Sequence, residues 1–405
     1  MRRVILIVLD GCGVGAMPDA ATYGSDDAAS ATLQHVAEAA GGLRLPTLER
    51  LGLGNVAAIQ GVAPVEAEGG WGRMAEASSG KDSVTGHWEM AGIITPKPFP
   101  TYPQGFPADV IAAFEGATRR GTLGNVAGSG TEIIRCFGAE HRATGKPIVY
   151  TSADSVFQVA AHEGVIPLEE LYAECQSARA LLTAPHNVLR VIARPFVGDG
   201  PDSFRRTEGR RDFPLPPPTP NLLTALQGAG RTAHAIGVVA DLFPRALFAR
   251  AERTQSNPAH LAAILRAVQS GAEDFVWANC EDFDMLYGHR NDARGFARAL
   301  EDFDAALTGI VAHLRPDDLL LLSADHGNDP TTASTDHARE FVPLLAWGGR
   351  LTGDLGTRAA FADVAATAMD WLGVAWAGPG RALTPAPGLP PLSSPGASRA
   401  PASGA

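Results

Sequence analysis

The chain has 405 residues, enough for two or three domains at roughly 150 residues each, and its composition is ordinary for a globular protein, with 45% hydrophobic and 19% charged residues. Its net charge of −11 argues against a general partner among nucleic acids or anionic membranes, and no apolar stretch approaches the roughly 18 residues that span a bilayer. The four cysteines lie far apart with no Cys-x-x-Cys pair, which fits a reducing compartment, so we expect a cytoplasmic protein.

The first predicted element is an apolar strand at residues 4–9, which runs directly into Asp10. The basic start and apolar run mimic an export signal, but the run is short and ends in an acidic residue, so we expect a strand. Residues 11–16 match the dinucleotide-binding pattern G-x-G-x-x-A. Met-Pro-Asp at 17–19 interrupts the helix that this pattern requires, so we predict no nicotinamide cofactor.

Residues 80–89, Gly-Lys-Asp-Ser-Val-Thr-Gly-His-Trp-Glu, place the hydroxyl of Thr85 near the start of a predicted helix. A helix N-terminus favours phosphate, and metal coordination turns a threonine hydroxyl into a nucleophile. Ser83 is a competing nucleophile. Asp82, Ser83 or Thr85 could also serve only as the N-cap of the helix.

Proline-rich stretches at residues 95–100 and 214–218 read as connectors. The segment between them has its own predicted strands, at 148–151 and 188–193, so we expect an inserted domain at 95–219 within a core made of 1–94 and 220–385. Residues 386–405 are rich in Pro, Ser, Ala and Gly and are expected to be disordered.

After the insertion, strand and helix patterns alternate, which predicts an α/β sheet with helices on both faces. Thr219-Pro220 and Asn257-Pro258 each predict a helix start, with an N-cap followed by proline. A predicted strand at 275–278 runs into an acidic stretch that contains Asp284, with His289 close behind, and residues 296–314 carry an apolar stripe at helical spacing.

The apolar run at residues 319–322 leads into Ser-Ala-Asp-His-Gly-Asn-Asp, which contains Asp325 and His326, and His337 follows in Thr-Asp-His. One interpretation is an ordinary turn, since Gly-Asn-Asp-Pro is good turn chemistry. The other is oxygen and nitrogen ligation of Mn²⁺, Zn²⁺ or Fe²⁺. Three strand ends deliver such residues to one edge of a parallel sheet, which favours a site for two ions.

These motifs together resemble bacterial phosphopentomutases, which belong to the alkaline phosphatase superfamily. The matching stretches are Asp10-Gly, Lys81-Asp-Ser-Val-Thr-Gly-His-Trp-Glu, Tyr150-Thr-Ser-Ala-Asp-Ser, Asp284-Met-Leu-Tyr-Gly-His-Arg-Asn-Asp, Ala324-Asp-His-Gly-Asn-Asp and Thr335-Asp-His. The resemblance implies an alkaline-phosphatase-like core with a doubly wound sheet and an inserted α/β cap.

The resemblance also implies roles for single residues. Asp284, His289 and His337 would bind one divalent ion, and Asp10, Asp325 and His326 a second, with Mn²⁺ the expected metal. Thr85 would carry the phosphoryl group that is transferred. The reaction implied is the interconversion of ribose (or deoxyribose) 1-phosphate and 5-phosphate, through a pentose 1,5-bisphosphate that also serves as activator.

In the inserted domain, Ser152, Asp154 and Val156 resemble the family's sugar-contacting loop. Arg190 and Arg194 are candidates to hold the distal phosphate, because a guanidinium matches phosphate geometry. The arginine-rich residues 205–211, including Arg210, are either further phosphate ligands or a solvated loop. The family usually has a lysine near the substrate phosphate where this chain has Val238, so that contact does not carry over. The loss would weaken substrate binding or alter the preference, unless an arginine such as Arg245 replaces the lysine.

Two other interpretations keep the same metal ligands. One is a different metal-dependent enzyme, and the other is a metal-bound protein without catalytic activity. A metal-dependent phosphatase or phosphodiesterase, or a phosphoglycerate-type mutase, would keep the metal pair but differ in the nucleophile loop or the cap. A metal-bound scaffold without activity is disfavoured because Thr85 and all six candidate ligands are present. The expected partners are small pentose phosphates, with no nucleic acid and no membrane.

Overall fold

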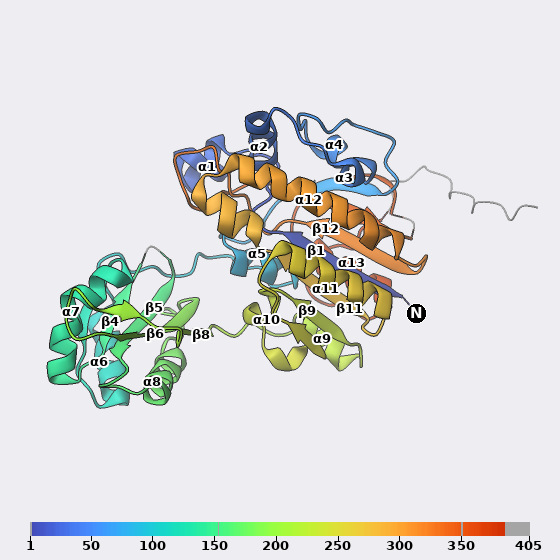
Figure 1. Ribbon diagram of the computed structural model, residues 1–405. Helices are drawn as coiled ribbons and strands as arrows, with labels where there is room; N and C mark the ends of the chain where they lie inside the picture. Colours follow the sequence, from blue (N-terminus) through green and yellow to red (C-terminus); the bar gives the residue numbers. More distant parts are fainter. Residues whose placement is uncertain (1, 153, 350, 385–405) are drawn as a thin grey trace, which may run out of the picture. The chain divides into compact units, whose positions relative to one another are not determined.

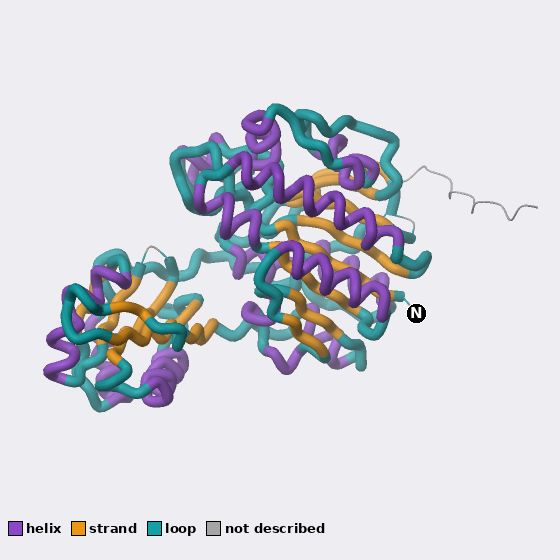
Figure 2. The backbone as a smooth tube through the Cα atoms, in the orientation of Figure 1, coloured by secondary structure: helices purple, strands orange, loops and turns teal. Residues whose placement is uncertain are grey.

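The computed structural model describes residues 2–152, 154–349 and 351–384, which form two compact units. We call Met1–Ile94, Thr219–Ala240 and Arg245–Ala405 the core unit, and Thr95–Pro218 with Asp241–Pro244 the inserted unit. Figure 2 shows strands flanked by helices in each unit. The predicted disordered segment at 386–405 lies outside the described residues.

The core unit contains an eight-stranded sheet among the described residues, in the order β10-β9-β11-β1-β12-β13-β2-β14. Its strands are β1 (Arg3–Leu9), β2 (Gly70–Met74), β9 (Ala233–Ile236), β10 (Arg250–Glu252), β11 (Phe275–Cys280), β12 (Asp318–Ser323), β13 (Val342–Trp347) and β14 (Gly353–Arg358).

The three central strands, β11, β1 and β12, are parallel neighbours. All their residues are buried, which is why the sequence shows near-continuous apolar runs rather than alternation. In the register, Leu9 pairs with Cys280 and Val8 with Ser323, so the three strands end at the same edge. The residues that follow them are therefore brought together there.

Helices pack on this sheet in two groups, which confirms the predicted α/β class (Figure 1). In the first, α12 (Ala293–Ala312) contacts α2 (Thr32–Ala40), α3 (Pro46–Arg50) and α11 (Asn257–Ser270). In the second, α13 (Asp363–Leu372) contacts β1, α5 (Ser83–Met90) and α9 (Leu222–Gly228). The remaining short helices are η1 (Ala20–Thr22), α1 (Ser25–Ala29), α4 (Leu53–Val56), α10 (Val239–Leu242), η2 (Arg245–Leu247), the π-helical η3 (Phe283–Tyr287) and η4 (Gly288–Arg290).

Two predicted helix starts are shifted by one or more residues. The N-cap of α11 is Ser256, and Asn257 is already its first residue. The helix expected at Thr219-Pro220 begins later, because Asn221 forms a capping box with Thr224. In α9 the Asn221 side chain satisfies a free N–H group of the first turn and so sets the boundary more strongly than Pro220 does. Ser256 makes no such side-chain hydrogen bond, and Pro258 lies in the first turn of α11 as predicted.

The inserted unit has its own sheet, in the order β3-β4-β5-β6-β7, with β8 also pairing with β6. Its strands are β3 (Leu123–Ala127), β4 (Ile148–Thr151), β5 (Val156–His162), β6 (Arg190–Val197), β7 (Arg205–Arg206) and β8 (Arg211–Pro214). Its helices are α6 (Ala108–Thr118), α7 (Gly130–Thr144) and α8 (Leu168–Leu181).

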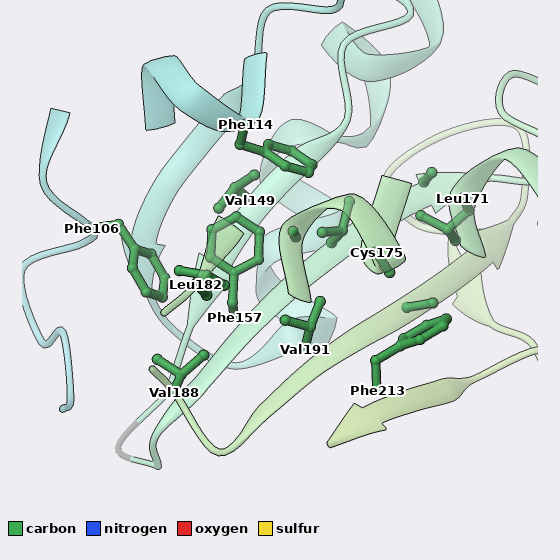
Figure 3. Packing of buried hydrophobic residues seen from close by; sticks show 14 of the residues in the cluster. Phe106, Phe114, Val149, Phe157, Leu171, Cys175, Leu182, Val188, Val191 and Phe213 are labelled. Carbon is green, nitrogen blue, oxygen red and sulfur yellow. The ribbon is translucent and has the colours of Figure 1, made fainter. Parts of the chain in front are cut away.

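Strand alternation divides the apolar residues of the inserted unit between two clusters. Val149, Phe157 and Val159 join the cluster drawn in Figure 3, which also contains Phe114 of α6 and Leu171 of α8. The neighbouring strand residues contribute to a second cluster with α7. Because successive side chains of a strand point to opposite faces, helices cover both faces of this sheet.

Candidate metal centre and nucleophile

The carboxyl edge of the core sheet collects the three candidate aspartates. Asp10 follows β1, Asp325 lies two residues beyond β12, and Asp284 lies in the π-helical η3 shortly after β11. All three side chains are buried. Ligand sites of open α/β sheets form at this edge, where the parallel strands end together.

One compact group consists of Asp10, Asp325 and His326, whose ligand atoms all lie within 4.8 Å of one another. His326 Nε2 is 3.3 Å from Asp10 Oδ1 and 3.5 Å from Asp325 Oδ2. The backbone N–H of Gly11 donates to Asp325 Oδ1 over 3.3 Å. One imidazole nitrogen thus faces two carboxylate oxygens.

A second group contains Asp284, His326 and His337, again with ligand atoms within 4.8 Å. His337 Nε2 lies 3.6 Å from Asp284 Oδ1, and His289 Nε2 lies 3.0 Å from Asp284 Oδ2. The other ring nitrogen of His289 is 2.6 Å from the carbonyl of Thr335, which orients Nε2 toward the aspartate. All six residues singled out in the sequence therefore meet in one place, with His326 between the two groups.

The electrostatics of this cluster fit divalent cations. Asp10 Oδ1 and Asp325 Oδ2 are buried, and neither accepts a hydrogen bond of normal geometry from a described residue. Burial, together with the neighbouring carboxylates of Asp325 and Asp284, raises the pKa of Asp10 to about 6. Three buried carboxylates repel one another unless a cation lies among them. A mixed carboxylate and imidazole set suits Mn²⁺, Zn²⁺ or Fe²⁺.

Two asparagines and a histidine support the aspartates, and the sequence analysis did not identify them. Asn279 Nδ2 donates to Asp10 Oδ2, and Asn328 Nδ2 donates to Asp284 Oδ1, each over 2.6 Å. His87 Nδ1 lies 3.3 Å from Asp325 Oδ2. The available signal was position, since Asn279 ends a buried strand and Asn328 lies within the Asp-His-Gly-Asn-Asp motif.

The candidate nucleophile Thr85 lies in the first turn of α5 and is 1% exposed. Asp82 is the N-cap, because its Oδ1 accepts from the backbone N–H groups of Val84 and Thr85. Thr85 Oγ1 donates to Asp82 Oδ2 over 2.6 Å. Neither Ser83 nor Thr85 is needed as the N-cap, so both hydroxyls are available for chemistry.

Close packing brings this helix against the metal cluster. A Cβ at Gly86 would lie 2.3 Å from the carbonyl oxygen of Asp325, so only glycine permits the approach. Ser83 Oγ lies 3.0 Å from His326 Nε2. The geometry therefore keeps Ser83 as the competing nucleophile, and Thr85 differs from it in being fully buried and held by Asp82.

The candidate sugar-contacting residues lie on one loop of the inserted unit. Ser152 is partly exposed and Asp154 is exposed, whereas Val156 is buried at the start of β5. The backbone N–H of Val156 donates to the carbonyl of Asp154 over 2.9 Å. Ser152 and Asp154 are therefore the accessible members of this set.

The candidate phosphate-binding arginines differ in how their charge is balanced. Arg210 makes two 2.9 Å hydrogen bonds to Asp212, and Arg190 lies 3.6 Å from the same carboxylate. Arg194 instead donates to the neutral amide of Gln158 over 3.0 Å. Burial lowers the pKa of Arg194, and the positive charges of Arg210 and Arg206 act in the same direction.

Arg206, another arginine of the 205–211 stretch, lies near this group. A Cβ at Gly130, the first residue of α7, would lie 2.5 Å from both Arg206 Nη2 and the hydroxyl of Tyr150. Arg194, Arg206 and Arg210 all act on the ionisation of Tyr150, whose pKa is nevertheless raised, chiefly by burial. Arg206 thus lies close to the Tyr150 hydroxyl, and the positive charges of Arg194 and Arg210 also favour its ionised form.

Arg245, the candidate replacement for the family lysine, and Val238 have the following contacts. The N–H of Val238 donates to Glu281 Oε2 over 3.2 Å. The guanidinium of Arg245 donates to the carbonyl of Phe248 over 2.6 Å. The carboxylate of Glu281 therefore faces the position where the family usually has a cation.

The chain is similar to known proteins over most of its length. The model of the metalloenzyme superfamily matches residues 2–375. The phosphopentomutase of Syntrophotalea carbinolica is 52% identical over 372 residues, covering 91% of this chain and 94% of that protein. The phosphopentomutase of Anaeromyxobacter sp. (strain K) is 53% identical over 379 residues, covering 92% and 96%. Among solved structures, the phosphoglycerate mutase of Leishmania mexicana aligns over 94% of this chain and 97% of its own, with a TM-score of 0.48 and 14% identity.

None of the helices in the described part of the chain has the length and apolar character to cross a membrane.

Proposed function

The chain belongs to the metalloenzyme superfamily and to its phosphopentomutases, and on this premise we propose that it isomerises pentose phosphates through a phosphothreonine at Thr85. The core is of the alkaline-phosphatase-like α/β type. The observation that carries the proposal is the packing of Gly86 on the backbone of Asp325, which holds Thr85 beside the metal cluster.

The site would hold two divalent ions, and we propose that they are Mn²⁺. Asp284, His289 and His337 would bind one ion. Asp10, Asp325 and His326 would bind the other. When bound, such a pair stabilises the attacking and leaving oxygens of an in-line phosphoryl transfer. The support for two ions is the pair of compact ligand groups and the orphaned oxygens of Asp10 and Asp325. His289 joins the first set through its 3.0 Å contact with Asp284.

Thr85 exchanges the phosphoryl group with the sugar in two half-reactions. With ribose 1-phosphate, the bond between Thr85 Oγ1 and phosphorus breaks, a bond to the sugar's 5-oxygen forms, and the proton of the 5-hydroxyl passes to Thr85. The resulting 1,5-bisphosphate then returns its 1-phosphoryl group to Thr85, and ribose 5-phosphate leaves with the proton on its 1-hydroxyl. Asp82 accepts the hydrogen bond of the free hydroxyl between the two steps. Added sugar bisphosphate activates the enzyme by phosphorylating Thr85.

The inserted unit would serve as a cap that holds the sugar and its second phosphate. Ser152, Asp154 and Val156 are the proposed sugar contacts. Arg190, Arg194 and Arg210 are the proposed phosphate contacts. Their support is the excess of positive charge around Arg194, which no described carboxylate neutralises directly. A cap also keeps water from the phosphoenzyme, which a mutase requires.

The test is to supply ribose 5-phosphate, Mn²⁺ and a trace of ribose 1,5-bisphosphate, and to follow products by ³¹P NMR. We expect ribose 1-phosphate with little free phosphate, whereas free phosphate as the main product would mean a hydrolase. Thr85→Ala should lose the activity and the phosphopeptide at Thr85, while Ser83→Ala keeps both. Transfer that survives in Thr85→Ala and disappears in Ser83→Ala would give the nucleophile's role to Ser83.

A further inference from the structure

Arg339 is a buried arginine that joins two loops of the site. Its side chain is 4% exposed and packs over the ring of Tyr23. The guanidinium pairs with Glu76 over 2.8 Å and with Asp19 over 3.0 Å. The two carboxylates carry more negative charge than is needed to neutralise the guanidinium. The other hydrogen bonds of the Arg339 side chain go to backbone carbonyl oxygens.

Those backbone contacts lie close to the candidate nucleophile Thr85. Arg339 Nη1 donates to the carbonyl oxygens of Ser78 and Gly80, over 2.8 and 2.6 Å. Gly80 lies directly against Thr85, since a Cβ there would be 2.7 Å from both Thr85 Oγ1 and Cγ2. The guanidinium therefore holds the backbone segment that packs on the Thr85 side chain.

The backbone of Arg339 connects it to the metal cluster, because Arg339 follows the candidate ligand His337 by two residues. Its backbone N–H donates to Asp27 Oδ1 over 2.8 Å. Lys81 bridges the same two loops, lying 3.0 Å from Asp27 and 3.4 Å from Asp336. The loop with His337 and the loop before Thr85 are thus fastened together at several points.

We propose that Arg339 is a positioning residue, which fixes Thr85 relative to His337 through the carbonyl of Gly80; this rests on Thr85 being the nucleophile. A lysine cannot replace it, since its single ammonium lacks the planar fork that reaches two carboxylates and three carbonyls at once. A nucleophile displaced by about 1 Å loses on the order of 100-fold in rate.

The experiment compares Arg339→Lys and Gly80→Ala with two matched controls. Gly80 has no left-handed backbone, and the three atoms nearest to a Cβ added there all belong to Thr85, so its alanine variant acts on the contact with Thr85. Arg3→Lys alters another buried arginine, paired with Asp318 at the far end of β1. Gly309→Ala adds a methyl group that meets nothing within 4 Å.

We expect kcat to fall on the order of 100-fold in both site variants, with KM and the Mn²⁺ affinity, followed by electron paramagnetic resonance, within about threefold of the unaltered chain. The double variant should lose much less than the product of the two single losses, because both act on one contact. Both controls should keep kcat, even where Arg3→Lys lowers the melting temperature.

Three outcomes would contradict the inference about Arg339, and a fourth would contradict the proposed function. Unchanged kcat in the folded Arg339→Lys protein would overturn the inference, and so would a loss explained by weaker Mn²⁺ binding. Full additivity of the two site variants would also overturn it. A rapid-quench experiment on the unaltered chain that finds no phosphate on Thr85 would overturn the proposed function itself, whatever Arg339 does.

Discussion

Asp10→Asn should stabilise the metal-free protein and destabilise the metal-loaded one. In the metal-free state, burial and the carboxylates of Asp325 and Asp284 raise the pKa of Asp10 from 3.8 to about 6. At 1.36 kcal/mol for each pKa unit, this corresponds to about 3 kcal/mol of destabilisation at pH 7. Asparagine removes the charge, and its carbonyl can still accept from Asn279, so the free energy of unfolding should rise by up to this amount.

The effect of Asp10→Asn on the free energy of unfolding depends on pH. Below pH 3.8 the carboxyl is protonated in both states, so its burial as an anion costs nothing. As the pH rises from 3.8 to about 6, the unfolded chain releases its proton more readily than the folded one, and the folded state loses stability. The advantage of Asp10→Asn should therefore appear across this window and stay constant above it.

Thermal unfolding in EDTA and in excess Mn²⁺, at several pH values, provides the assay. In EDTA at pH 7.5 the variant should melt on the order of 5 °C above the unaltered chain. In Mn²⁺ the order should reverse, because the variant gains less from binding. As a control, Asp274→Asn removes a carboxylate that accepts from Arg231 and Thr232 at the other end of β11, and should destabilise in both buffers. An Asp10→Asn protein that melts below the unaltered chain in EDTA would refute the reasoning.

Three further predictions test other parts of the molecule. Gly86→Ala should abolish Mn²⁺ binding measured by calorimetry, because its Cβ would lie 2.3 Å from the carbonyl oxygen of Asp325; binding at normal affinity would contradict the packing argument. Arg194→Met should raise KM for ribose 5-phosphate roughly 10-fold or more through the loss of a charge-assisted contact, while Arg142→Met, at an exposed ion pair, leaves KM unchanged. Burial raises the pKa of Glu174 to about 7, so the free energy of unfolding of the inserted unit should fall as the pH rises from 4.5 through 7. Glu174→Gln should flatten this pH dependence in circular-dichroism melts. An unchanged slope would exclude Glu174 as its source.

Much of the metal cluster was predictable because its ligands follow strands. Buried parallel strands appear in the sequence as apolar runs, and their ends meet at one edge whatever their order along the chain. Asp10 and Asp325 could therefore be placed together before any coordinates. The division of the ligands between two ions came from the family resemblance and stays a prediction, since the two compact groups share His326 and neither contains His289.

The supporting contacts could not be predicted in the same way. Arg339 stands in a loop, and its partners at Asp19, Glu76 and Gly80 come from distant segments that only the tertiary fold brings near. No periodicity identifies such a residue. The start of α9 was missed for a related reason, since Thr219 and Asn221 are both suitable N-cap residues and only the local geometry shows that Asn221 forms the capping box.

The place of β1 at the centre of the core sheet has a consequence for the order of events during synthesis. Val4 pairs with Phe275 on one side and with Leu319 on the other, so β1 has no neighbours in the sheet until residues 275–323 have been synthesised. The inserted unit draws its sheet from one continuous segment and can fold in the meantime. Loops of such length slow folding and leave apolar strand edges open to association. The candidate metal ligands run from residue 10 to residue 337, so the metal site cannot assemble on the ribosome before His337 has emerged.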